Sequence, residues 1–157
     1  MTKLLLAGAA ATLIATAALA DPVTRTITID TPKYEGTKTI TRDREEGTLS
    51  RDTDLTRKAD GATASRDYDR HRTDTGFTAT GSTTRFNGDT RSFDYERTRT
   101  ANGYTAEGSL TRFNGKTYDY DARVRRGEYR VSRTQVLRNE NGRVVAARRT
   151  VRPRRHR

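Results

Sequence analysis

Apolar and polar residues alternate with a period of two along much of the chain beyond residue 20. In 103–112 the apolar residues Tyr104, Ala106 and Leu110 occupy even positions together with Gly108, and in 117–125 the apolar residues occupy even positions again. A β-strand directs successive side chains to opposite faces, so this alternation is typical of strands with one covered face. Because the intervening Asn114-Gly115 favours a tight turn, the pattern predicts a β-hairpin.

The hairpin pattern recurs along the chain at a fixed interval. Residues 76–98 align with 103–125 without gaps, and twelve of the 23 positions are identical. A looser copy lies in 55–69, with Asp60-Gly61 at its turn. Repetition of this kind predicts an all-β fold, an antiparallel meander of about ten short strands built from hairpins. Such a meander either closes into an up-and-down barrel or stays an open sheet, and both alternatives fit the pattern.

Loop lengths predict which residues face each other in the hairpins. A three-residue loop that ends at Gly115 places Gly108 opposite Tyr120, and the equivalent loop of the preceding copy places Gly81 opposite Phe93. The other predicted loops are a four-residue loop at 58–61 and two-residue turns at Thr75-Gly76, Asn102-Gly103 and Arg126-Gly127. With these loops the apolar residues share one face of the sheet, while threonine and acidic residues share the other.

The composition beyond residue 20 supports a second interpretation. Leu, Ile, Val and Phe together number only 18 in 21–157, which with a net positive charge is typical of disordered chains. The 25 threonines and seven tyrosines favour strands instead. Because every predicted loop keeps the two faces consistent, we favour an ordered sheet, with a largely disordered chain as the alternative.

The first twenty residues have the pattern of a cleavable secretory signal peptide. Lys3 precedes an uncharged apolar stretch that ends in Ala18-Leu19-Ala20, with small residues at the positions that a signal peptidase reads. The stretch is short for a membrane anchor, which is the competing interpretation. We expect cleavage after Ala20 and export to the periplasm or the extracellular space. The mature chain then has a β-repeat domain, 21–151, and a flexible basic tail, 152–157, with no transmembrane segment.

Residues that perform catalysis or bind metals are scarce in this sequence. The chain has no cysteine, and His71 is the one histidine outside the C-terminal tail. No common nucleophile or zinc motif occurs, so we expect neither an enzyme nor a bound metal or cofactor. Acidic pairs such as Asp67/Asp69 and Asp119/Asp121 share a strand face. We expect them to offset nearby arginines rather than to bind calcium, since no glycine-rich calcium loop accompanies them.

Arginine is strongly preferred over lysine among the basic residues. The mature chain has 26 arginines and four lysines, and eight of these arginines lie in 138–157. The planar guanidinium group suits phosphate and sulfate, so we predict a site for an anionic polymer or for lipid headgroups of the cell envelope. The predicted site residues are Arg148, Arg149, Arg152, Arg154, Arg155 and Arg157. A tail that merely improves solubility is the simpler interpretation of the same residues.

Two functions fit these observations. The first is an exported, non-enzymatic envelope or extracellular protein that binds a polyanion through arginine-rich surfaces. The second is a structural β-repeat protein with no small ligand, whose uncovered strand edges associate with other copies. Salt dependence separates the two, because polyanion binding weakens steeply as the ionic strength rises.

Overall fold

The computed structural model describes residues 21–154, and this part of the chain consists of strands and turns. The strands are β1 (Val23–Asp30), β2 (Tyr34–Asp43), β3 (Thr48–Arg57), β4 (Thr63–Arg72), β5 (Gly76–Thr84), β6 (Thr90–Thr100), β7 (Gly103–Thr111), β8 (Thr117–Arg126), β9 (Arg130–Asn139) and β10 (Val144–Pro153). A helix with the length and hydropathy needed to cross a bilayer is not found within this described range. The predicted signal peptide, 1–20, and the end of the predicted tail, 155–157, lie outside the described residues.

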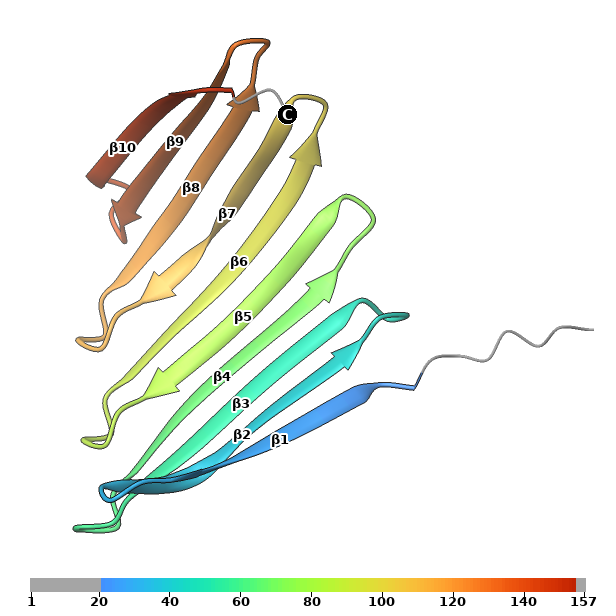
Figure 1. The fold of residues 1–157 in the computed structure, drawn as a ribbon. Helices are drawn as coiled ribbons and strands as arrows, with labels where there is room; N and C mark the ends of the chain where they lie inside the picture. The colour runs from blue at the N-terminus through green and yellow to red at the C-terminus, as the bar shows by residue number, and fades with distance from the viewer. Residues whose placement is uncertain (1–20, 155–157) are drawn as a thin grey trace, which may run out of the picture.

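All ten strands join one antiparallel sheet in the order in which they occur in the chain. Figure 1 shows a single twisted layer that runs from β1 (blue) to β10 (red), with these two strands at opposite edges. The predicted meander of ten strands is therefore confirmed, and it forms an open sheet rather than a closed barrel. The alternative of a largely disordered chain does not hold for residues 21–154.

The three-residue hairpin loops have the predicted conformation and register. Gly115 has a φ of 74°, in the left-handed region that glycine adopts without strain. Gly108 lies opposite Tyr120, and Gly81 lies opposite Phe93, as the predicted loop length requires. Local turn chemistry therefore determines the pairing within these two hairpins.

The predicted two-residue turns are at the wrong positions. The turns lie at 74–75, 101–102 and 128–129. Each pairing is shifted by an even number of residues, so the assignment of side chains to faces is unchanged. The partners do change, because Tyr95 lies opposite Gly108 rather than opposite Leu110.

The displaced turns have a physical reason in the neighbouring strands. Gly76 and Gly103 are the first residues of strands, not turn residues. A Cβ atom at Gly76 would collide with the carbonyl oxygen of Arg97, and one at Gly103 with the carbonyl oxygen of Val124. These glycines are therefore required by the close approach of the next strand, which short-range turn patterns do not reveal.

The hairpin repeat extends further in the structure than in the sequence. The loop between β9 and β10 contains Asn141-Gly142, which follows Asn114-Gly115 at the interval of the repeat, and Gly142 has a φ of 71°. The pairs β3–β4, β5–β6, β7–β8 and β9–β10 are thus four successive hairpins of one series. The last hairpin keeps the turn of the repeat but little of its strand sequence.

The sheet has a thin core because it has only one layer. Among the described residues, the buried hydrophobic side chains are Ala79, Ala106, Ala122 and Val124. A sheet normally covers one face with a second layer of helices or strands. No such layer exists within residues 21–154, so both faces of the sheet are accessible.

Candidate functional site

The strand register divides the side chains between two faces of different character. Residues opposite each other in neighbouring strands share a face, and successive residues of a strand lie on opposite faces. One face, which we call the arginine face, has aromatic rings and the cations Arg25, Lys38, Arg42, Arg51, Arg57, Arg66, Arg70, Arg72, Arg91, Arg97, Arg99, Arg126, Arg133, Arg148 and Arg152. The other, the acidic face, has threonines, serines and the carboxylates Asp30, Glu35, Asp43, Asp52, Asp54, Asp67, Asp69, Asp94, Glu96, Glu107, Asp119 and Asp121.

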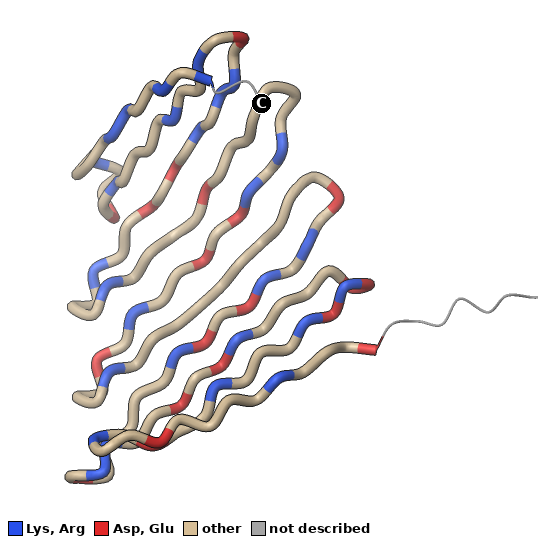
Figure 2. Tube along the Cα trace, in the orientation of Figure 1, with Lys and Arg blue, Asp and Glu red and all other residues tan. Residues whose placement is uncertain are grey.

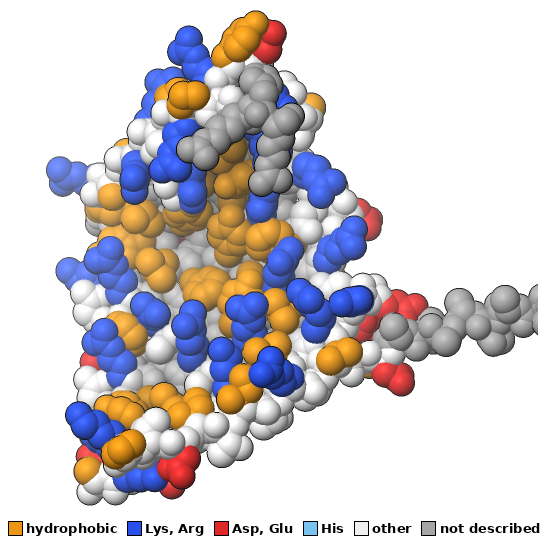
Figure 3. Space-filling view, viewed as in Figure 1, with side chains coloured by type: hydrophobic (Ala, Val, Ile, Leu, Met, Phe, Trp, Pro, Cys, Tyr) orange, Lys and Arg blue, Asp and Glu red, His pale blue; other side chains and the backbone are white. Residues whose placement is uncertain are grey.

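Every Asp and Glu of strands β1–β10 lies on the acidic face, so the arginine face of these strands has no carboxylate. Figure 2 shows how the two signs of charge intersperse along the strands when both faces are drawn together. Figure 3 views the arginine face and shows hydrophobic side chains in its middle, Lys and Arg among and around them, and acidic side chains only at the margins. A surface whose charged side chains are all positive attracts anions over its whole width.

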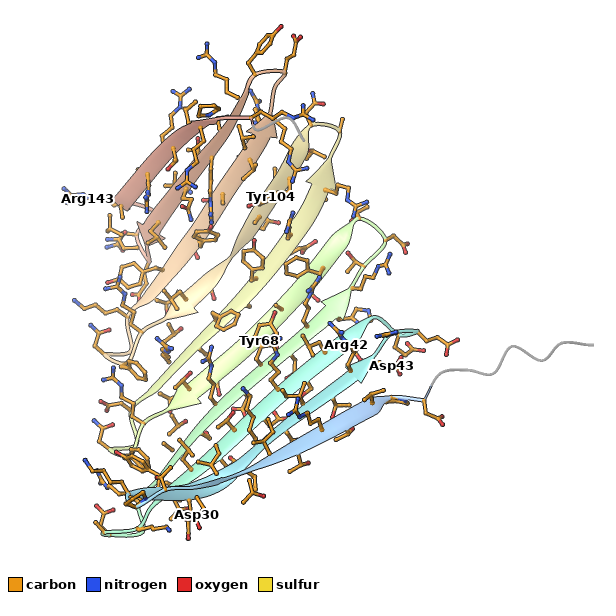
Figure 4. All side chains as sticks on the ribbon, viewed as in Figure 1. Asp30, Arg42, Asp43, Tyr68, Tyr104 and Arg143 are labelled. Atoms are coloured by element: carbon orange, nitrogen blue, oxygen red, sulfur yellow. The ribbon has the colours of Figure 1, made fainter. Side chains whose placement is uncertain are left out.

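Arginine side chains lie over the aromatic rings of the arginine face. The guanidinium carbon of Arg97 is 3.8 Å from the ring centroid of Tyr104, and that of Arg70 is 4.2 Å from the centroid of Phe77. Figure 4 shows the side chains of this face, with Tyr104 labelled on β7. Stacking on a ring leaves the N–H groups at the guanidinium edge free to bond an anion. The ring also restrains the side chain, so less conformational freedom is lost on binding.

Glycines allow aromatic rings to meet across an intervening strand. Gly108 lies between Tyr95 of β6 and Tyr120 of β8, whose ring centroids are 6.1 Å apart. Gly81, the equivalent glycine of the preceding copy, is flanked in the same way by two rings whose centroids are 6.3 Å apart. Burial among these neighbours raises the pKa of Tyr95 above the ordinary value of a phenol. The rings form two groups in contact, Tyr68–Phe93 and Phe77–Tyr95–Tyr120, and arginine side chains lie over both groups.

Few carboxylates neutralise the arginine face. Among residues 21–154, the ion pairs are Arg57–Asp60 (2.6 Å), Lys58–Asp30 (2.5 Å) and Arg138–Asp121. Of these cations only Arg57 belongs to the arginine face, and its hydrogen bond with Asp60 raises the pKa of Arg57 and lowers that of Asp60. Within the described part of the chain, the other cations of the face have no carboxylate partner, so their charge is available to a ligand.

Two hollows mark the opposite ends of the arginine face. The hollow over β7–β10, which we call the groove, has a volume of about 420 Å³, and its lining includes Tyr104, Arg126, Val131, Arg133, Arg148 and Arg152. Interaction with the hydroxyl of Tyr120 raises the pKa of Arg133, which favours its charged form. The second hollow, about 520 Å³, lies over β1–β3 and is lined by Arg25, Arg42, Arg44 and Arg51 together with Asp21.

The structure divides the predicted cluster of C-terminal arginines. Arg148 and Arg152 lie on the arginine face and line the groove, whereas Arg149 lies on the acidic face. Arg154 follows β10 and donates a hydrogen bond of 3.3 Å to a backbone carbonyl at the β8–β9 turn. The other two predicted residues, Arg155 and Arg157, lie outside the described residues.

Arg126 and Arg133 are the groove residues that the sequence prediction missed. The prediction treated the C-terminal arginines as a tail that begins at residue 152, but β10 continues to Pro153, so Arg152 belongs to the sheet. The signal for the groove is nonetheless present in the sequence. Arg126 has the same parity as the apolar residues of β8, and Arg133 has the parity of Val131 and Leu137 in β9, whereas the apolar residues of β10 do not alternate and give no such signal.

The acidic face brings like charges together rather than forming a metal site. Glu107 lies opposite Glu96 on one side and opposite Asp121 on the other, and like charges in such positions repel. Within residues 21–154, no group of three or more His, Cys, Asp or Glu side chains is arranged to hold a metal ion. His71 is exposed on this face, opposite Thr48 and Thr78. The acidic face is therefore a solvated surface.

Comparisons of the chain with protein-family models, with curated proteins and with solved structures find no match. The fold and the arginine face define the class of the protein as a single-layer β-repeat sheet with one cationic, aromatic face. Both hollows of the arginine face are open and lined by several arginines, which suits extended anions better than a small enclosed ligand.

Proposed function

We propose that the protein is an exported, non-enzymatic protein of the cell envelope or extracellular space that binds an anionic polymer or anionic lipid headgroups through its arginine face. Export follows from the predicted signal peptide, 1–20, and places the mature chain where such anions are abundant. The absence of cysteine and the isolated, exposed His71 favour binding over catalysis.

One observation supports this proposal above all others, namely that every carboxylate of the strands lies on the acidic face. Random placement of the strand acids would put some of them on the arginine face, where they would neutralise its cations. Instead, the cations of the strands share their face with aromatic rings and other uncharged side chains, and Arg57 is the only one of them in an ion pair within residues 21–154. Keeping carboxylates away from stacked arginines is useful when the partner itself supplies the negative charge.

Binding to heparin tests the proposal directly. The mature chain should bind heparin, and the logarithm of its affinity should fall linearly with the logarithm of the salt concentration, because counterions are released. Arg148→Gln, on the arginine face, should weaken binding more than Arg149→Gln, its neighbour on the acidic face. Vesicles with and without anionic lipid distinguish headgroups from polymers. If neither heparin nor anionic vesicles bind, the proposal fails.

A second function, self-association, is favoured by the contrast between the two edges of the sheet. β10 has a bulge between Val144 and Ala146 and ends at Pro153, and both features hinder pairing with a further strand. β1 has neither feature, and all of its residues pair in regular register with β2. The exposed edge of β1 is therefore open to another strand.

β1 is self-complementary about its centre. Since Thr31 N–H bonds to Tyr34 O at the β1–β2 turn, the alternation of the ladder directs the backbone groups of Thr26 away from β2, to the free edge. In an antiparallel pair of two β1 strands centred on Thr26, Val23 faces Ile29 of the second copy, and no like charges meet. A two-fold axis perpendicular to the sheet then places both arginine faces on the same side.

Sedimentation velocity over a range of concentrations tests this second function. The mature chain should form dimers, and Thr26→Pro should abolish them by removing a backbone donor at the free edge. Thr26→Ala is the matched control, because it removes the side chain but keeps the N–H group, and it should dimerise normally. A chain that stays monomeric at all concentrations, or dimers that survive Thr26→Pro with the fold intact by circular dichroism, would exclude β1 as the interface.

A further inference from the structure

The repeat places one arginine near the same margin of every second strand. Arg72, Arg99 and Arg126 recur at the interval of the repeat and lie near the C-terminal ends of β4, β6 and β8 on the arginine face. Their respective partners in the next strand are Phe77, Tyr104 and Val131. Arg152 of β10 lies opposite Val131 from the other side and continues the series. We call these four arginines the guanidinium row.

The guanidinium row crosses the strands at a regular and wide spacing. Arg72 pairs with Phe77, and Phe77 pairs with Arg97 on its other side. Arg99 therefore lies two strands across from Arg72 and two residues further along the strand direction. With about 4.8 Å between strands and about 3.3 Å per residue, the Cα atoms of Arg72, Arg99 and Arg126 in a flat sheet are about 12 Å apart, and those of Arg126 and Arg152, directly across β9, are about 10 Å apart. The whole row then spans about 30 Å from β4 to β10.

The members of the row are accessible and uncompensated. All four side chains are exposed, and none of them forms an ion pair with a carboxylate among residues 21–154. Arg126 and Arg152 also line the groove, where Gln135 and Thr150 add neutral hydrogen-bonding groups beside the ring of Tyr104. Guanidinium groups, an amide, a hydroxyl and the edge of an aromatic ring together suit a ligand that has both anionic groups and hydroxyls.

The covered rings argue against single-stranded nucleic acid as the ligand. Proteins that bind single strands stack the bases on free ring faces. Here Arg70 and Arg97 already lie over Phe77 and Tyr104, the two rings beside the row.

We propose that the guanidinium row binds a linear acidic polysaccharide that lies across strands β4–β10, with its carboxylate or sulfate groups held by successive arginines. A repeating row of cations matches a polymer whose anionic groups also repeat. This inference rests on the proposed binding of polyanions by the arginine face, and adds the class of ligand and the direction in which it lies.

Two triple variants of equal charge test the role of the row. The first is Arg72→Gln with Arg99→Gln and Arg126→Gln, and the matched control on the acidic face is Arg123→Gln with Arg125→Gln and Arg149→Gln. Binding to a polyuronate and to heparin is measured by titration calorimetry at two salt concentrations. The row variant should lose about tenfold or more in affinity, with a shallower dependence on salt, while the control changes little.

Other results overturn the inference in distinguishable ways. Equal losses of affinity in the two triple variants would mean that net charge alone attracts the polymer. That result would contradict the role of the guanidinium row but would leave the proposed polyanion binding intact. Tight binding of a single-stranded oligonucleotide without binding of the polyuronate would show that the ligand of the row is a nucleic acid and not a polysaccharide. If the wild-type chain binds neither polymer nor oligonucleotide, the proposed function fails as well. Circular dichroism and the denaturation midpoint of each variant show whether the sheet is intact.

The length of the polymer gives a second, independent readout on the unmodified chain. Polyuronate oligomers that span the row should bind better than oligomers that reach only one or two arginines, and the gain should level off once the chain length exceeds about 30 Å. Affinity that does not change with oligomer length would show that one arginine site suffices, and would contradict a ligand that lies across the strands.

Discussion

Side chains of the arginine face contact one another across several strands, whereas those of the acidic face form shorter, pairwise contacts. On the arginine face Tyr95 packs against both Phe77 and Tyr120, with ring centroids 5.7 and 6.1 Å apart. On the acidic face the contacts are hydrogen bonds between single pairs, such as the 2.7 Å bond from Ser82 to Asp67. Cross-strand packing of the first kind is the main way in which a sheet without a second layer gains stability.

This contrast shows that stability and the proposed binding depend on the same side of the sheet. A two-layer protein buries its core in one place and binds ligands in another, but this chain has no second layer within residues 21–154. Its rings are at once the packed layer and the support for the arginines. Substitutions on the arginine face should therefore cost stability, and equivalent substitutions on the acidic face should not.

Loss of the central ring should have the largest effect. Tyr95→Ala removes a half-buried ring that packs against two others, so we expect the free energy of unfolding to fall by about 3 kcal/mol. Ser92→Ala, in the same strand but exposed on the acidic face, should change it by less than about 0.5 kcal/mol. Urea denaturation followed by circular dichroism measures both, and equal effects would mean that the rings do not hold the sheet together.

A side chain at Gly108 should have the next largest effect. A Cβ atom at Gly108 would first meet the backbone of β6, at the carbonyl oxygen of Asp94, whereas one at the equivalent Gly81 would first meet the ring of Phe93. Gly108→Ala must push the strands apart, and should lower the free energy of unfolding by about 2 kcal/mol. Gly127→Ala is the control, because a Cβ there makes only ordinary contact at 3.5 Å. An unchanged midpoint for Gly108→Ala would contradict the register.

Removal of a stacked guanidinium should have a smaller effect. Arg97→Gln abolishes the contacts of its guanidinium group with Tyr104 (3.8 Å) and Phe77 (5.7 Å), and should cost about 1 kcal/mol of stability. Arg125→Gln removes the same charge from the acidic face, where no ring lies beneath it, and should be close to neutral. Thermal denaturation of the two variants at equal ionic strength measures both effects. Equal destabilisation would indicate that the charge of the arginine, rather than its stacking on the ring, contributes to stability.

The smallest expected effect has the opposite sign. Glu107 lies opposite carboxylates in both neighbouring strands, so Glu107→Gln should relieve repulsion and stabilise the sheet by about 0.5 kcal/mol at low salt. The gain should shrink in high salt as the charges are screened. Glu45→Gln, at an exposed position in the β2–β3 loop, is the control. Destabilisation by Glu107→Gln would show that these carboxylates hold a cation or a partner instead of repelling each other.

Features that depend on a few consecutive residues are predictable from this sequence. The parity of the apolar residues and the glycine-containing loops at 58–61, 86–88 and 113–115 predict the strands, the faces and the register of three hairpins, because each is determined within one hairpin. The positions of the turns near Gly76 and Gly103 were not predictable in this way. Those glycines are required by the carbonyl groups of the following strand, and that contact exists only once the sheet has formed.

The candidate site was predictable only in part for a related reason. A dense run of arginines near the C-terminus drew attention to residues such as Arg148 and Arg152, which do lie in the groove. Their partners Arg126 and Arg133 come from β8 and β9 and are not conspicuous in the sequence. Only the pairing of these strands brings the four arginines together, and it also separates Arg149 from them.

The consecutive strand order has a consequence for how the chain folds and how it can change in length. Each strand pairs only with the strands next to it in sequence, so no contact has to wait for distant segments to meet. Folding can begin at any hairpin and spread to its neighbours, as in other linear repeat proteins. Duplication or loss of one repeat unit adds or removes two strands and one arginine of the row, and leaves every other pairing as it was.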